Sequence, residues 1–119
     1  MRSYHRDDFI RIRDFLVETY AQFGRPHNWM IDRWNFTASV SRTMHGVSWQ
    51  AWASEIAVWE DVGRIIAVVN TEGEQRGEAF FQVPGEQPLP GDVLLEMFAF
   101  CETRLGIEDA ETGTRRIYL

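Results

Sequence analysis

Cysteine is almost absent from this chain: Cys101 is the only one among 119 residues. One thiol cannot close an internal disulfide, and it cannot build a cysteine-based zinc site. Disulfide-stabilised scaffolds and zinc-finger folds are therefore excluded. A chain that depends on no disulfide suits a reducing compartment, and we expect the protein in the cytoplasm.

Long apolar runs are also missing. Apolar runs such as those at 65–69 and 93–95 fall far short of the ~20 consecutive apolar residues that a membrane-spanning helix requires. The first residues lead directly into Asp7 and Asp8, without the apolar stretch of a secretory signal. The sequence therefore predicts no membrane span and no export.

Positive charge is scarce. Lys and Arg together number 12 against 18 Asp and Glu, which leaves a formal net charge of −6. No basic cluster is longer than the pair Arg115 and Arg116, so the field around the chain would repel a phosphate backbone. Nucleic acid is not expected as a partner.

The rest of the composition is that of an ordinary globular protein, 45% hydrophobic and 25% charged. This balance allows one packed core, and the length suits a single domain over residues 1–119. No repeat, low-complexity tract or linker divides the sequence. A natural polypeptide that continues past Leu119, as the front part of a tandem protein, is the alternative.

The N-terminal part predicts a short strand followed by two helices. Residues 1–4 favour a strand, and Asp7 or Asp8 offers an N-cap carboxylate to a helix that ends at Phe23, before a Gly/Pro break. A second helix is expected over 30–44, where no Gly or Pro intervenes. In the first helix, apolar residues at three- and four-residue spacing predict a core stripe of Phe9, Ile12, Leu16, Tyr20 and Phe23.

The middle of the chain changes to short runs rich in Val, Ile, Phe and Trp. Three strands are predicted, over 55–59, 64–69 and 77–83. The connections at 60–63 and 70–76 are short and contain Gly. We therefore expect two hairpin turns and an antiparallel meander.

A Gly/Pro-rich turn over 84–91 must leave the sheet, since its three prolines have no backbone N–H. The helix that follows begins near Asp92. Its predicted apolar stripe comprises Leu94, Met97, Phe98, Cys101 and Leu105. A last strand at 115–119 is expected to run parallel beside the strand that ends at Val83, as a right-handed strand, helix, strand crossover.

Three local sequences accompany this order of elements: Gly-Arg-Pro-His-Asn-Trp at 24–29, Arg33 with Trp34, and Gly-Glu-Ala-Phe at 77–80. Together with the order of the elements, they resemble the front portion of the GNAT N-acetyltransferase fold. The resemblance implies an α/β (α+β) domain with a GNAT-like mixed sheet. In such a domain an antiparallel meander precedes the strand, helix, strand crossover, and helices cover both faces.

In that family the fourth strand leads into a turn of the pattern Gln/Arg-x-x-Gly-x-Gly/Ala. The amides of this turn, with the N-terminus of the next helix, hold the pyrophosphate of acetyl-CoA. Here Gln87 matches the first position, whereas Pro90 and Asp92 replace the small residues. Asp92 can instead cap the helix with its carboxylate. The resemblance thus implies a weakened acetyl-CoA site, with these cofactor-binding residues: Phe81, Gln82, Val83, Gln87 and Gly91.

The resemblance also suggests catalytic and acceptor residues. Glu78 could act as the base for an attacking amine, and the alternative is a solvated residue or an ion-pair partner. The rings of Trp29, Trp34 and Trp59 could line a pocket for a small-molecule amine, and the alternative is core packing. The family's proton-donating tyrosine lies on a helix after the fifth strand, beyond Leu119, so we expect an incomplete catalytic set.

Metal and thiol chemistry have little support. His5, His27 and His45 lack the spacing of a metal site, and no metal is expected. Cys101 falls within the apolar stripe of the last helix, which indicates a packed and inert thiol rather than a nucleophile.

Three functions remain open from the sequence. The first is a GNAT-type domain with weakened acetyl-CoA binding, which shapes a pocket or braces a second acetyltransferase domain. The second is an active N-acetyltransferase that moves acetyl from acetyl-CoA to a small amine. The third is a non-enzymatic dimerisation module, in which the open edge of the strand at 115–119 pairs with another copy to form a homodimer.

Overall fold

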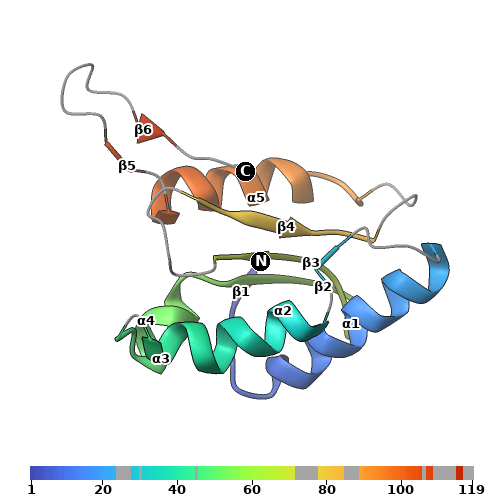
Figure 1. The fold of residues 1–119 in the computed structure, drawn as a ribbon. Helices are drawn as coiled ribbons and strands as arrows, with labels where there is room; N and C mark the ends of the chain where they lie inside the picture. Colours follow the sequence, from blue (N-terminus) through green and yellow to red (C-terminus); the bar gives the residue numbers. More distant parts are fainter. Residues whose placement is uncertain are drawn as a thin grey trace.

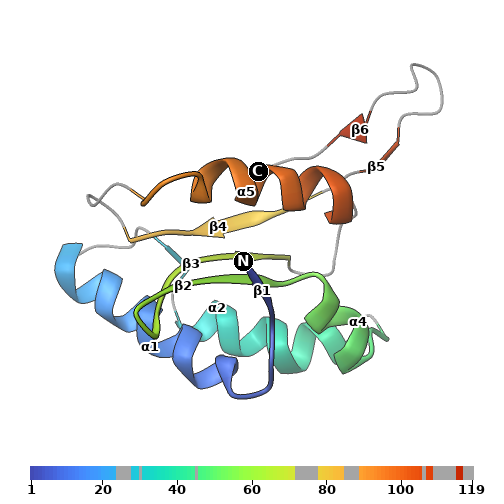
Figure 2. The same cartoon turned by 180° about the vertical axis from the view of Figure 1, so that it is seen from behind.

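The computed structural model describes residues 1–23, 28–29, 31–44, 46–71, 78–84, 89–105, 107–108 and 115–116. Within these residues the chain is a mixed α+β unit. A four-stranded antiparallel sheet lies between helices on both of its faces (Figure 1 and Figure 2). The expectation of helices on both faces is confirmed.

The sheet contains β1 (Arg2–Ser3), β2 (Ala57–Asp61), β3 (Arg64–Asn70) and β4 (Phe80–Gln82), in this order. Every neighbouring pair is antiparallel. The predicted meander is therefore confirmed. The strand expected over 77–83 is shorter than predicted, and Glu78 lies before it in an isolated bridge.

The connection between β2 and β3 is the predicted hairpin turn. It consists of Val62 and Gly63, and both have positive φ, +52° and +75°. Two-residue turns of this hand match the twist of the flanking strands. The turn expected over 70–76 lies mostly outside the described residues.

The predicted crossover is wrong for the residues that the structure describes. β6 (Arg115–Arg116) pairs antiparallel with β5 (Ile107–Glu108) and not with β4. Both figures show this small hairpin projecting beyond the C-terminal end of the last helix. Pairing β6 with β5 closes a much shorter loop than pairing it with β4 across that helix, and a shorter loop costs less entropy. The main sheet is therefore antiparallel and not mixed.

The helices form two layers. One face of the sheet carries α1 (Asp8–Phe23), α2 (Ile31–Phe36), η1 (Thr37–Ser41), α3 (Arg42–Met44) and α4 (Trp49–Ser54). The other face carries α5 (Val93–Phe100), which continues into η2 (Cys101–Leu105). The helix expected over 30–44 is confirmed, with a π-helical stretch at its centre.

The sequence analysis missed α4. Ser48 precedes it with extended backbone angles and accepts a hydrogen bond from the Ala51 N–H at 3.1 Å. Trp52 and Ala53 are buried beneath this helix. A cap and two buried side chains are enough to hold so short a helix against the core.

Two apolar clusters lie on opposite faces of the sheet, as expected for strands whose side chains alternate. Val58 and Val68 join the cluster under α1 and α2, which also includes Ile12, Leu16, Trp34 and Trp52. Trp59 and Val69 join the cluster under α5, which also includes Met97, Cys101 and Leu105.

Both predicted apolar stripes include residues whose side chains are exposed in the structure. On α1, Ile12 and Leu16 are buried, but Tyr20 is 43% exposed, while Phe15 and Thr19 are buried in its place. Both figures show the C-terminal end of α1 extending past the strands, so the last part of this helix has no sheet beneath it. The side chain of Phe23 lies outside the described residues.

On α5, the predicted stripe divides into a buried and an exposed part. Met97, Cys101 and Leu105 are buried, whereas Leu94 is 47% and Phe98 38% exposed. Leu95 is 68% exposed. The helix is apolar around most of its circumference, and only one side can face the sheet.

A charged network fastens β1 and α1 to the β2–β3 hairpin. The guanidinium of Arg2 binds both carboxylate oxygens of Asp8, at 2.6 and 2.7 Å, and also binds Glu60. Arg11 binds Glu60 at 2.6 Å and the Gly63 carbonyl at 2.9 Å. Two cations and two anions are therefore paired at this edge of the domain.

Candidate functional site

The end of β4 and the start of α5 form the region where the sequence predicted a cofactor site. Gly91 has φ +52°, a left-handed conformation that favours glycine, and Asp92 precedes the first residue of α5. The Val93 N–H donates to the Pro90 carbonyl at 3.3 Å, so this amide is already used inside the turn.

Asp92 does not cap α5 with its side chain, contrary to the expectation from the sequence. Its backbone angles are φ −97° and ψ 19°, and its carboxylate makes no capping hydrogen bond. A capping residue normally has an extended backbone, which brings its side chain back to the N–H groups of the first turn. The exposed carboxylate therefore places negative charge at the start of the helix.

Val83 follows β4, and the side chain of Asn28 forms hydrogen bonds with its backbone. Asn28 Oδ1 accepts from the Val83 N–H at 2.9 Å, and Asn28 Nδ2 donates to the Val83 carbonyl at 2.7 Å. The same Nδ2 donates to Thr19 Oγ1 at 3.0 Å, which fixes the amide against α1. Both backbone polar groups of Val83 therefore have a partner within the chain.

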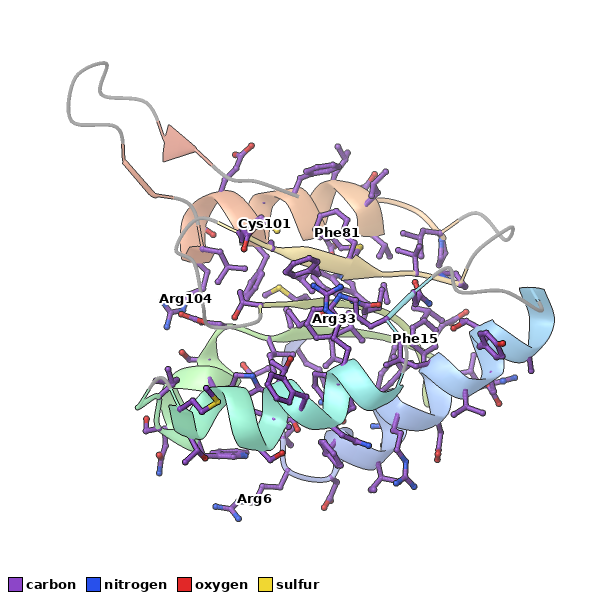
Figure 3. All side chains as sticks on the ribbon, viewed as in Figure 1. Arg6, Phe15, Arg33, Phe81, Cys101 and Arg104 are labelled. Atoms are coloured by element: carbon purple, nitrogen blue, oxygen red, sulfur yellow. The ribbon has the colours of Figure 1, made fainter. Side chains whose placement is uncertain are left out.

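The two residues before Val83 are also engaged. Gln82 is buried; its Oε1 accepts from the Trp29 N–H at 2.8 Å, and its Nε2 donates to Asn70 Oδ1 at 3.1 Å. Phe81 pairs with Val69 in the sheet. Its ring meets that of Phe98 at 5.2 Å, between the sheet and α5 (Figure 3).

Other predicted site residues are less constrained. Glu78 is half-buried, and its side chain has no hydrogen bond or ion pair within the described part of the chain. Its role as a base stays a prediction. Gln87 lies outside the described residues.

The sheet separates the three tryptophans of the predicted acceptor pocket. Trp29 and Trp34 belong to the cluster under α1 and α2, whereas Trp59 lies on the α5 face. Trp59 Nε1 donates to Glu96 Oε2 at 2.7 Å. Trp29 meets the Phe80 ring at 5.1 Å, and the Arg33 guanidinium lies 4.3 Å from the Trp29 ring. Only Trp29 and Trp34 share one face.

A small cavity of about 260 Å³ lies beside Pro84, between α1 and the start of β3. Its polar lining includes Glu18, Asp61 and Arg64, and Arg64 pairs with Glu18 at 3.2 Å. The balance of charge is acidic, so an anionic ligand would be repelled here.

Cys101 is buried against the α5 face of the sheet, as the packed-thiol interpretation requires. Burial raises the pKa of the Cys101 thiol to about 11, and the charge of Glu102 adds to the shift. A thiol that stays protonated at neutral pH is a poor nucleophile. Among the described residues, no three His, Cys, Asp or Glu side chains lie close enough to hold a metal ion.

The residue that reasoning from the sequence missed is Asn28. It falls in the Gly-Arg-Pro-His-Asn-Trp segment, which contributed to the family resemblance without any role being predicted for Asn28. Its partner Val83 is 55 positions away, and no local pattern links the two.

No helix in the described residues combines the length and the apolar composition that a membrane crossing needs. Comparison with protein-family models, with curated proteins and with solved structures found no match to this chain.

Proposed function

We propose that this chain is a GNAT-type acetyltransferase domain with weakened acetyl-CoA binding and a supporting role. It would shape the acceptor pocket of a second acetyltransferase domain or brace that domain. The proposal combines the resemblance in sequence with the contacts at the end of β4.

The occupied backbone of Val83 is the observation that carries the proposal. A strand end that stabilises the oxyanion of a thioester must offer free N–H groups to the ligand. The Asn28 side chain already takes the Val83 N–H at 2.9 Å. Acetyl-CoA would have to displace a bidentate amide contact that Thr19 also supports.

The turn before α5 supports the same conclusion. Pro90 has no N–H to give, the Val93 N–H is used by the Pro90 carbonyl, and the Asp92 carboxylate would repel a pyrophosphate. The described residues therefore fit acetyl-CoA poorly, and we assign them no step in acetyl transfer.

A supporting role also suits the outer face of α5. Leu94, Leu95 and Phe98 are exposed on a helix with little polar surface. A domain that braces another needs such a face, because apolar area removed from water is the main source of association energy.

Calorimetric titration with acetyl-CoA tests the proposal. We expect no saturable heat at micromolar ligand for the native sequence, and tighter binding for the double variant Pro90→Gly, Asp92→Gly, which removes the charge and restores donors. Micromolar affinity in the native chain would contradict the proposal and would favour the active N-acetyltransferase. No gain in the double variant would mean that Asn28, and not the turn, blocks the site.

A homodimerisation module is the second candidate, because the β5–β6 hairpin lies apart from the main sheet. An isolated two-stranded hairpin is marginally stable in water, and a second copy could complete it. Light scattering with and without residues 115–119 decides this candidate. A dimer that becomes a monomer on truncation supports it, and an unchanged mass eliminates it.

A further inference from the structure

A groove of about 390 Å³ lies on the α1 and α2 side of the sheet, away from the turn before α5. We call it the aromatic groove, because its walls include the rings of Tyr4, Phe9, Trp49 and Trp52. Its volume falls within the range of small-molecule sites. None of the described residues that the sequence predicted as site residues lines it.

The walls are held rigidly by contacts between rings. The ring centroid of Tyr4 lies 5.2 Å from that of Trp52, in an edge-on arrangement, and 6.1 Å from that of Trp49. Phe9 stacks on Trp34 with 5.7 Å between the ring centroids. Tyr4 and Trp52 are buried. Walls fixed in this way are preorganised for a flat apolar ligand, which loses little free energy to rearrangement of the protein.

Among the described residues, Arg6 is the only charged one that lines the groove. Its guanidinium lies 4.7 Å from the centre of the Trp49 ring and makes no ion pair within the described part of the chain. Figure 3 places Arg6 at the lower edge of the molecule, below the helices of this face. In a protein with a net charge of −6, this is a local positive site.

Uncharged donors lie near it. The Asn35 side-chain amide lines the groove and makes no hydrogen bond within the described residues, while Ser39 Oγ donates to the Asn35 carbonyl at 2.8 Å. Trp52, in the wall, has a buried Nε1 without a partner among the described residues. Buried polar atoms usually have a partner, and this N–H is one of three buried side-chain groups in the described residues that do not.

We propose that the aromatic groove binds a small aromatic carboxylate. The ring would lie between the aromatic walls, and the carboxylate would bind the Arg6 guanidinium, with the Asn35 amide as a second donor. A cationic ligand is disfavoured because Arg6 already occupies the face of Trp49 and would repel it. This inference does not depend on the proposed acetyltransferase role.

Titration calorimetry with four matched probes tests the proposal. Phenylacetate supplies both the ring and the charge, phenylacetamide lacks the charge, benzyltrimethylammonium reverses it, and acetate lacks the ring. We expect saturable binding of phenylacetate at millimolar concentration or below, and affinity about tenfold weaker or worse for the other three, because a charge-assisted contact and an aromatic surface both contribute.

Two arginine variants identify the site. Arg6→Gln should weaken phenylacetate binding about fivefold to tenfold, the range for a partly exposed charge-assisted contact. Arg13→Gln removes the same charge from α1 outside the groove and should leave the affinity unchanged. Circular dichroism confirms that each variant folds; if Arg6→Gln does not, Arg6→Lys, which keeps the charge, should retain binding.

The proposal is overturned by any of three results. These are a failure of phenylacetate to bind at millimolar concentration, equally tight binding of the neutral or the cationic probe, and an affinity of Arg6→Gln equal to that of Arg13→Gln.

Discussion

At the scale of single residues, the Asn28 side chain holds the backbone at the end of β4. Its amide is bonded to the N–H and the carbonyl of Val83 and to Thr19, so three hydrogen bonds depend on one side chain. The same contacts stabilise the fold and close the strand end to a ligand.

Asn28→Ala should lower the free energy of unfolding by about 2 kcal/mol, because it leaves two partly buried backbone groups without partners. Thr19→Val is the matched control, since it removes the bonds of Thr19 Oγ1 to the Leu16 carbonyl and to Asn28 Nδ2 but keeps both contacts to Val83. Its loss should be smaller, about 1 kcal/mol. Urea unfolding measures both variants, and equal losses would mean that the contact with Val83 contributes little.

Asp8 is the second residue whose side chain stabilises the fold through several contacts. Burial alone would raise its pKa, but hydrogen bonds from Arg2 and from the His5 N–H, with the charges of Arg2 and Arg11, hold the pKa below its ordinary value of 3.8. Hydrogen bonds from Arg2 and Arg11 also lower the pKa of Glu60. Both carboxylates are therefore more acidic in the folded chain than in the unfolded chain.

The sign of the resulting pH dependence follows from linkage. A carboxylate whose pKa is lowered by folding stabilises the folded chain at pH values above its ordinary pKa. For Asp8 this contribution is lost as the pH falls below 3.8 and through the pKa of the folded state. Asp8→Asn should cost about 2 kcal/mol at neutral pH and should flatten the loss of stability in acid. Urea midpoints between neutral pH and pH ~3 test this. Asp14→Asn, exposed on the same helix, should keep the steep dependence of the native chain.

At the scale of elements, the β2–β3 hairpin carries local strain. Val62 is almost fully exposed at φ +52°, a conformation that β-branched residues rarely adopt. Val62→Asn should stabilise the chain by about 1 kcal/mol, because Asn tolerates this conformation and Asn-Gly is the preferred pair for such a turn. Thermal unfolding should show a higher midpoint for Val62→Asn and no increase in the midpoint for Val62→Ile.

The two sides of α5 should respond differently to truncation. Met97→Ala empties a fully buried site and should cost about 2–4 kcal/mol, whereas Leu95→Ala, on the exposed side, should cost less than about 0.5 kcal/mol. Denaturant unfolding of the isolated chain measures both. Comparable losses would mean that the outer face of α5 is covered in the isolated chain.

Reasoning from the sequence identified the elements that carry their own periodicity. α1 and the β2–β3 hairpin were predicted because their side chains repeat at helical or alternating spacing and a Gly marks the turn. α4 was missed because six residues hold too few repeats to reveal a helix, and its stability comes from Ser48 and the buried Trp52. The parallel last strand was wrong because partner choice between distant strands depends on loop entropy.

The turn between the fourth strand and the last helix was predicted in position, but its contacts were not. The sequence located the turn between β4 and α5 and the charge of Asp92. It did not reveal that the Asn28 side chain forms hydrogen bonds with the backbone of Val83, nor that Trp59 and Trp29 lie on opposite faces of the sheet. Contacts between distant segments depend on the packed geometry, which leaves no local pattern in the chain.

At the scale of the whole molecule, the sheet divides the domain into two surfaces. One carries the aromatic groove with Arg6, and the other carries α5 with its exposed leucines. The strand end that the resemblance predicts as a cofactor site lies between them, and the Asn28 side chain is bonded to its backbone at Val83. This arrangement supports the proposed bracing role over a transfer of acetyl groups.

The most direct test of this account is an NMR titration of the isotope-labelled chain with acetyl-CoA, read at the backbone amides of Phe81, Val83 and Gly91. The account predicts that these signals stay in place under a modest excess of ligand, because Asn28 holds Val83 and Asp92 repels the pyrophosphate. Saturable shifts of these amides at micromolar acetyl-CoA would contradict it.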